Sequence, residues 1–145
     1  MRFIIASHPS ESADPAAASH PAPDEALLTA YMKFNEEMHK AGVLVASEGL
    51  NPAGRGARIE ARNGKRSVVD GPFAESKELV GGFYIIDVAS LEEAVSWALR
   101  CPTGLAFADV LDIRPLTGEA DLPAEMLAII RKAAPTWSAA FHKKA

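Results

Sequence analysis

Cysteine is almost absent from this chain, since Cys101 is the only one among 145 residues. A single cysteine excludes an internal disulfide and is typical of proteins in reducing compartments. Long apolar runs are lacking as well. The N-terminal run, residues 3–6, is shorter than the ~7–15 residues of a signal peptide and the ~20 of a spanning helix. We therefore expect a cytoplasmic protein with no membrane partner.

The chain also lacks an excess of basic residues and the common metal and cofactor motifs. Its net charge is −4, whereas surfaces that bind nucleic acid phosphates are usually basic. The four histidines have no metal-ligand spacing, and neither a Ser-His-Asp order nor a dinucleotide fingerprint occurs. The sequence thus predicts no nucleic-acid partner, no metal and no cofactor.

What the chain does contain is an alternation of strand-like and helix-like segments. The composition, with 48% hydrophobic and 23% charged residues, is ordinary for a single globular domain. Asn63-Gly64 predicts a type I′ turn that pairs Arg62 with Lys65 and Ile59 with Val68. Pro123 opens a C-terminal helix. Apart from this hairpin and helix, the expected strands cover 2–7, 43–48, 83–88 and 108–114, and the expected helices cover 25–41 and 91–100.

This order of elements predicts an α+β fold: a ferredoxin-like βαβ-βαβ sandwich with an inserted β-hairpin and a C-terminal helix. In residues 43–48, Val43 and Val45 are expected on one face, and Leu44, Ala46 and Glu48 on the other. Both faces are therefore apolar, although two helices can cover only one of them. We expect a homodimer to bury the second face by packing sheet on sheet.

Three segments resemble the YCII-related, or DGPF-domain, family. They are VVDGPFAESKELVGGFYIIDVASLEEAVSWALRCP at 68–102, FNEEMHKAGVLVASEGLNPAGRGARI at 34–59 and DVLDIRPL at 109–116. The similarity covers residues 1–117, which are therefore expected to form the YCII-related domain. Residues 118–145 are expected to be a helical extension packed on the same domain.

The resemblance implies a dimeric α/β barrel, built from two ferredoxin-like protomers and related to muconolactone isomerase-like proteins. Much of the family has no assigned activity, and some relatives use a His-Asp pair in a cleft. Neither Asn35 nor His39 in the first helix corresponds to that histidine, so the resemblance assigns this chemistry to no residue here. Some relatives adjoin or are fused to sigma-factor domains, which keeps a regulatory role open.

The run Asp70-Gly71-Pro72-Phe73 is the first candidate site. Asp70 can tie the turn together through backbone N–H groups, or it can be a carboxylate held at the mouth of a cleft, where burial raises its pKa. Phe73 is a candidate anchor and ligand contact. Lys77 lies in a charged loop that is either solvated surface or a site for an anionic ligand.

Two further residues complete the predicted site. Glu48 ends an apolar strand face, where it either emerges into solvent or lines a pocket. His8 follows the first strand and can reach a site at its end. Asp70 and Glu48 are thus the catalytic candidates, and Lys77, Phe73 and His8 the ligand-binding ones. The loop 9–23, rich in Pro, Ala and Ser, is expected to be the least ordered internal segment, either a surface excursion or a lid.

Two hypotheses of function follow. The first is a small-molecule-binding enzyme, a lyase or isomerase that uses cleft carboxylates as acid and base. The second is a non-catalytic dimeric binding or regulatory module, for example a partner of sigma-factor-type regulators. An enzyme requires a carboxylate with a shifted pKa in a cleft, whereas a docking module requires only an exposed apolar patch.

Overall fold

The computed structural model describes residues 1–8, 25–51, 56–70, 80–102 and 110–141. Its main element is an antiparallel four-stranded sheet in the order β2-β5-β1-β6. This is the ferredoxin-like order, so the predicted α+β class is confirmed. The strands are β1 (Arg2–His8), β2 (Leu44–Gly49), β5 (Gly82–Asp87) and β6 (Val110–Pro115).

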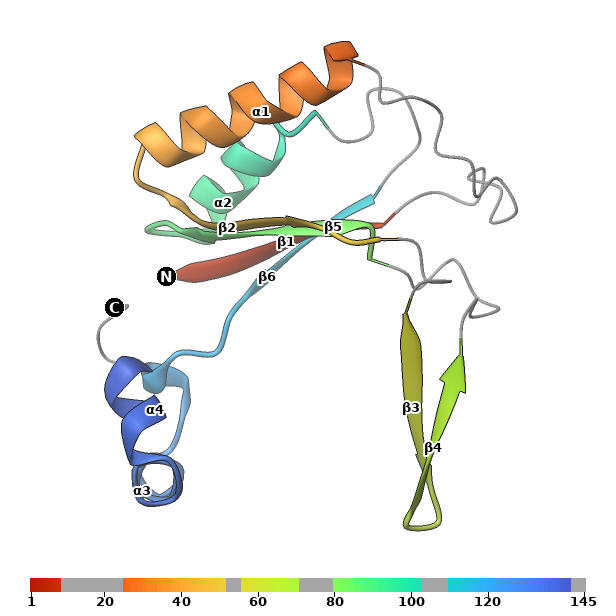
Figure 1. The fold of residues 1–145 in the computed structure, drawn as a ribbon. Coiled ribbons are helices and arrows are strands. Elements are labelled where there is room, and N and C mark those ends of the chain that lie inside the picture. The colour runs from red at the N-terminus through yellow and green to blue at the C-terminus, as the bar shows by residue number, and fades with distance from the viewer. Residues whose placement is uncertain (9–24, 52–55, 71–79, 103–109, 142–145) are drawn as a thin grey trace.

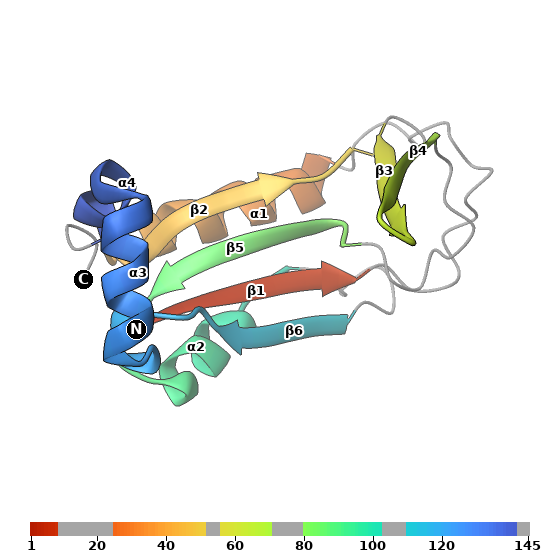
Figure 2. The same cartoon turned by 90° about the horizontal axis from the view of Figure 1, so that it is seen from below.

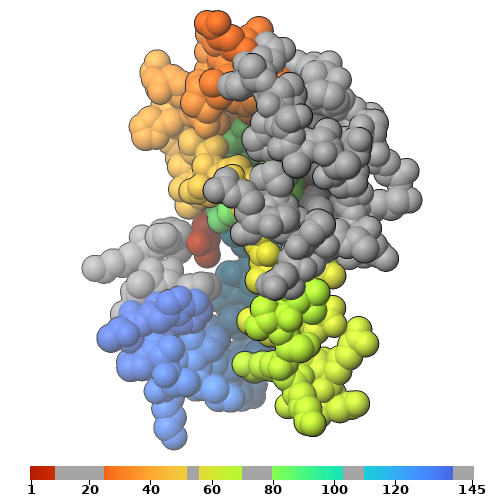
Figure 3. All heavy atoms as spheres, turned by 45° about the vertical axis from the view of Figure 1, so that its right-hand side comes forward, coloured from red at the N-terminus to blue at the C-terminus, as the bar shows by residue number. Residues whose placement is uncertain are grey.

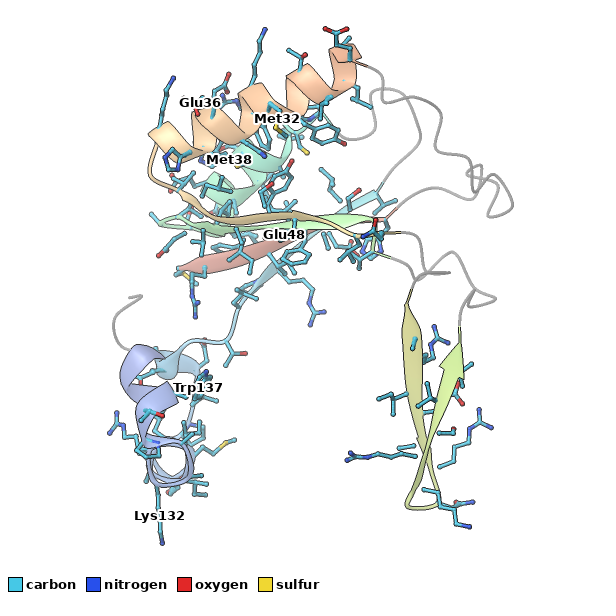
Figure 4. All side chains as sticks on the ribbon, viewed as in Figure 1. Met32, Glu36, Met38, Glu48, Lys132 and Trp137 are labelled. Atoms are coloured by element: carbon cyan, nitrogen blue, oxygen red, sulfur yellow. The ribbon has the colours of Figure 1, made fainter. Side chains whose placement is uncertain are left out.

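Helices α1 (Glu25–Lys40) and α2 (Leu91–Ala98) cover one face of this sheet (Figure 1). Apolar residues at helical spacing along α1 place Phe34 and Met38 in the core. Met38 lies between the helix and the sheet, and Glu36 lies on the outer side (Figure 4). The core cluster consists of Phe3, Ile5, Phe34, Met38, Ile86, Val88, Ala94, Ala98 and Cys101.

The inserted hairpin forms a separate two-stranded sheet of β3 (Ala57–Arg62) and β4 (Lys65–Asp70). Its register is the predicted one, with Arg62 opposite Lys65 and Ile59 opposite Val68. Asn63 and Gly64 have φ values of 51° and 75°, as a type I′ turn requires. Arg62 Nη2 lies 3.3 Å from Glu60 Oε2, and this attraction offsets the repulsion between Arg62 and Lys65.

The C-terminal segment contains a short 3₁₀ helix, η3 (Glu119–Asp121), and two α-helices, α3 (Ala124–Ala133) and α4 (Pro135–Phe141). Pro135 follows the end of the first α-helix and begins the second. These helices and the hairpin lie at opposite ends of the sheet, on the side away from α1 and α2 (Figures 1 and 2). The space-filling view shows them as two separate masses (Figure 3). None of the described helices has the length and hydropathy that crossing a bilayer requires.

A β-bulge in β2 changes one predicted orientation. Leu44 pairs with Ile86, but Ala46 pairs with Ile85, so the register shifts across Val45. Leu44 therefore packs on the helix-covered core, whereas Ala46 and Glu48 belong to the uncovered face. The prediction that all three share a face is wrong, because strict alternation does not hold across a bulge.

The uncovered face is apolar at its centre. Ile4 pairs with Ile85, and Ala6 pairs with Phe83, on the side away from α1 and α2. All four residues are buried or half-buried. The homodimer expected to cover this face, and the division of the chain at residue 117, stay predictions.

Gly82 yields a test of the β2–β5 contact. A Cβ at Gly82 would lie 2.9 Å from the backbone oxygen of Glu48, whereas one at the paired Gly49 would have no neighbour within 4 Å. We expect Gly82→Ala to lower the free energy of unfolding by about 1–3 kcal/mol, because backbone cannot yield as a side-chain end can. Gly49→Ala, the matched control, should stay within about 0.5 kcal/mol of the parent. Urea denaturation measures both, and equal stability of the two variants would contradict the contact.

Candidate functional site

On the side of the sheet that faces the helices, the side chains become smaller from one end of the strands to the other. At one end, Phe3 and Ile86 fill the space beneath the helices. At the other end, Ser7 pairs with Gly82, and Gly82 pairs with Gly49. These three residues form a row with almost no side chains, which we call the glycine row. The sheet is therefore hollow beneath the N-terminal half of α1.

This hollow is a pocket of about 290 Å³ between α1 and the sheet, which we call the α1 pocket. The helix contributes Leu28, Tyr31, Met32 and Asn35 to one wall. The facing wall consists of Ser7, Ser47, Gly49, Gly81, Gly82 and Tyr84. Glu48 and Phe83 border the pocket too, but their pairing and the alternation of strand residues direct their side chains to the opposite face.

A hydrogen-bonded chain of neutral side chains runs along the pocket wall. The Asn35 Nδ2 group donates to Ser47 Oγ at 3.1 Å. The Tyr84 hydroxyl hydrogen-bonds to Ser47, which lowers the pKa of Tyr84, and to Cys101, which raises it. These contacts link Asn35, Ser47, Tyr84 and Cys101 in one chain along the pocket wall.

The chain includes one buried acceptor. The Asn35 carboxamide has its nitrogen toward Ser47 Oγ, and none of the described residues donates to the buried Asn35 Oδ1. An unpaired buried acceptor costs about 1–3 kcal/mol, so this atom favours any donor, a water or a ligand group, that can reach it.

Tyr84 is held firmly in this chain. Its ring packs edge-on against Phe34, with centroids 5.6 Å apart. Burial raises the pKa of Tyr84 far above its ordinary value of 10.0, and neighbouring Cys101 and Tyr31 raise it further. Tyr84 is therefore a protonated hydroxyl at neutral pH and takes no part in proton transfer as a phenolate.

A second polar pair lies on the opposite face of the sheet. His8 Nε2 is 3.2 Å from Asp112 Oδ2, and the side chains are 25% and 60% exposed. Asp112 pairs with Ala6, and Ala6 and His8 point the same way because they are two residues apart in β1. The side chains of His8 and Asp112 therefore both belong to the uncovered face. A carboxylate at this distance can orient an imidazole for proton transfer. Ser7 and His8 are consecutive, and hence the sheet separates this pair from the α1 pocket.

The predicted site residues do not converge on the α1 pocket. Glu48 is exposed and borders the pocket only at its edge. His8 is paired with Asp112 on the other face. The Asp70 backbone ends β4 opposite Ala57, but its side chain, with Phe73, Lys77 and loop 9–23, lies outside the described residues.

Sequence reasoning missed the residues that form the pocket wall. Asn35, Ser47 and Tyr84 carry no motif, and their spacing does not predict that they meet. Gly81-Gly82 before a strand is typical of close backbone approach or of a bulge, and Gly82 makes such an approach to Glu48. Within the described residues, no group of three His, Cys, Asp or Glu side chains is placed to hold a metal.

Comparisons with known proteins place this fold in context. The family model of the YCII-related domain matches residues 1–117, which include the whole four-stranded sheet with α1 and α2. An uncharacterised protein of Rhizobium meliloti (strain 1021) is 34% identical over 93 residues, which cover 64% of this chain and 75% of the relative. The structure of 5-chloro-2-hydroxyhydroquinone dehydrochlorinase (TftG) from Burkholderia phenoliruptrix AC1100, in complex with 2,5-dihydroxybenzoquinone, has a TM-score of 0.45 at 14% identity, over 85% of this chain and 100% of that one.

The raised pKa of Tyr84 predicts a pH dependence of stability. In the unfolded chain a tyrosine ionises near pH 10, whereas folded Tyr84 retains its proton well above that pH. Unfolding therefore releases a proton above about pH 10, so this contribution to stability is complete below that pH and is lost as the pH rises. We expect absorbance titration at 295 nm to show one late-ionising tyrosine in the folded protein. Tyr84→Phe should remove it and Tyr31→Phe should keep it; a late phase that survives Tyr84→Phe would contradict the assignment.

Proposed function

This chain belongs to the YCII-related family, and we propose that it is a small-molecule-binding protein whose ligand occupies the α1 pocket. The observation that carries the proposal is the glycine row. Three adjacent strands place Ser7, Gly82 and Gly49 side by side beneath a helix, where a sheet normally presents large apolar side chains. The pocket opens to solvent at Gly49 and Gly81, which are exposed, so a ligand has a way in.

The polar chain supports the same proposal. Ligand pockets are mostly apolar, with a few placed polar groups that orient the ligand. Leu28, Tyr31 and Met32 supply the apolar wall. Asn35 belongs to the pocket wall, and no described residue donates to its buried Oδ1. Tyr84 cannot move without breaking its contact with Phe34 and its bonds to Ser47 and Cys101, so the wall is pre-organised.

A second candidate function is acid–base catalysis at the uncovered face. The 3.2 Å pair of His8 and Asp112 favours it. Here the imidazole, rather than a pair of carboxylates, is the general base, and Asp112 holds its orientation. A lyase or isomerase of this kind begins by taking a proton from carbon next to a carbonyl group. A partner protomer packed on the uncovered face would enclose this pair, so the proposed homodimer and this chemistry support each other.

A pocket-filling substitution tests ligand binding. Gly49→Leu places a side chain into open space, since nothing lies within 4 Å of its Cβ. The probes are a fragment set of carboxylates, amines and neutral ring compounds, followed by amide NMR. We expect at least one fragment to shift the amide signals of Ser47, Gly49 and Gly81, and we expect Gly49→Leu to weaken its binding tenfold or more because the space is filled.

The control is Ala61→Leu, which adds the same bulk on the exposed hairpin and should leave binding unchanged. Binding that survives Gly49→Leu, or a fragment set that leaves the pocket amides unmoved, would refute the proposed site.

Deuterium exchange tests the second candidate. In heavy water, 2-cyclohexenone should exchange its acidic carbon-bound protons faster with the protein than without it. His8→Gln should lower the protein-catalysed rate by about 100-fold or more, since general bases contribute factors of this order. Asp112→Asn should lower it less, and Asp87→Asn, at the far end of the same face opposite Arg2, should not change it. An unchanged rate in His8→Gln would exclude His8 as the base.

A further inference from the structure

The charges around the α1 pocket select against ionic ligands. None of the described residues that line it is a lysine or an arginine, so an anion finds no counter-ion among them. Glu48 at the edge would repel an anion. Its carboxylate belongs to the opposite face, so it is not placed to pair with a cation inside the pocket. Entry of a charged group into an unpaired site costs far more than entry of a neutral one. The pocket therefore suits a neutral molecule.

The shape of the α1 pocket selects for a flat molecule. Gly49, Gly81 and Gly82 form a floor of bare backbone, and Leu28 and Met32 of α1 lie across from it. A ring that lies parallel to the sheet contacts both walls at once, whereas a puckered or branched molecule must push the helix outward. The volume of about 290 Å³ is at the lower end of the range for ligand pockets, ~300–1,000 Å³. This size fits a single ring.

The polar end of the pocket requires a donor. Asn35 Oδ1 can only accept, and no described protein group donates to it. Met32 lies three residues before Asn35 on the same side of α1 and is 53% exposed. Asn35 Oδ1 is closed off from solvent, so the pocket wall must open for a ligand to reach it. Met32 is the exposed residue of this wall whose three torsions let it move.

We propose that the ligand of the α1 pocket is a flat, neutral, single-ring molecule that carries an O–H or N–H donor at its edge, and that Asn35 recognises this donor through Oδ1. This inference rests on the proposed function, because it specifies what the same pocket binds. It makes Asn35 a specificity-determining residue. The ring lies on the glycine row, its edge points along α1 toward Asn35, and Ser47 holds the carboxamide in the receiving orientation.

Four probes of similar size test flatness, neutrality and the donor separately at pH 7. Phenol is flat, neutral and a donor; anisole lacks the donor; benzoate carries a negative charge; cyclohexanol is not flat. Dissociation constants come from the shifts of the Ser47, Gly49 and Gly81 amides. We expect phenol to bind about tenfold more tightly than anisole, because the donor satisfies a buried unpaired acceptor. Benzoate and cyclohexanol should bind more weakly than phenol by a similar or larger factor.

The variant Asn35→Leu keeps the size of the side chain and removes the acceptor. It should bring phenol to within about twofold of anisole while anisole is unaffected, and Asn35→Gln should restore part of the preference. Tighter binding of benzoate or cyclohexanol than of phenol, or equal binding of phenol and anisole in the parent, would overturn the inference while leaving the pocket as a binding site. If none of the four probes moves the pocket amides but a compound of the fragment set does, the inference fails and the pocket remains a binding site. If neither the probes nor the fragments move them, the proposed function fails as well.

Discussion

The packing of Phe34 and Met38 against the sheet holds α1 in place, and the pocket depends on it. Both side chains are buried among Phe3, Ile5 and Ile86, so the C-terminal half of the helix is anchored to large residues. A helix is rigid over this length. Its N-terminal half therefore continues above the glycine row, where the strands carry almost no side chains. The helix cannot settle onto the glycine row without losing its own core contacts. An empty space with these walls therefore persists, although cavities generally cost stability.

Close contact between β2 and β5 keeps the floor of this space in position. Gly82 approaches the backbone oxygen of Glu48 so nearly that a Cβ would meet it at 2.9 Å. On the same strands, Ser47 and Tyr84 are paired and are linked through their hydroxyl groups. The same register of β2 against β5 thus produces both the glycine contact and the link between Ser47 and Tyr84. A slip of β2 by one residue would turn Ser47 to the other face and direct Glu48 toward α1 instead.

The sheet also divides the candidate chemistry of the protein. Ser7 and His8 follow one another in β1, but alternation sends them to opposite faces. The face toward α1 carries neutral groups, with Tyr84 kept protonated by burial. The other face carries the His8 and Asp112 pair beside apolar residues that α1 and α2 do not cover. Binding at the α1 pocket and proton transfer at the uncovered face are consequently separate proposals, and a single ligand cannot contact both through the sheet.

Local chemistry was sufficient to predict much of the fold from the sequence. Asn63-Gly64 determined the hairpin and its register, because few residues adopt positive φ at two successive positions. The spacing of Phe34 and Met38 determined which side of α1 is buried, because the helical period is a property of the backbone. The order of strands and helices determined the ferredoxin-like topology, since connections between such elements are constrained in hand and length. The Gly81-Gly82 pair indicated close approach but not its partner.

Tertiary structure alone decided the candidate site. A bulge at Val45 moved Leu44 to the helix-covered face, and no local signal marks where an extra residue enters a strand. Asn35 and Ser47 are brought within 3.1 Å by the packing of α1 on β2, and His8 is brought to Asp112 by the pairing of the first strand with the last. These contacts join residues that are 12 to 104 positions apart. Sequence periodicity describes each element by itself, whereas the height of a helix above a sheet and the emptiness beneath it depend on the side chains of every strand together.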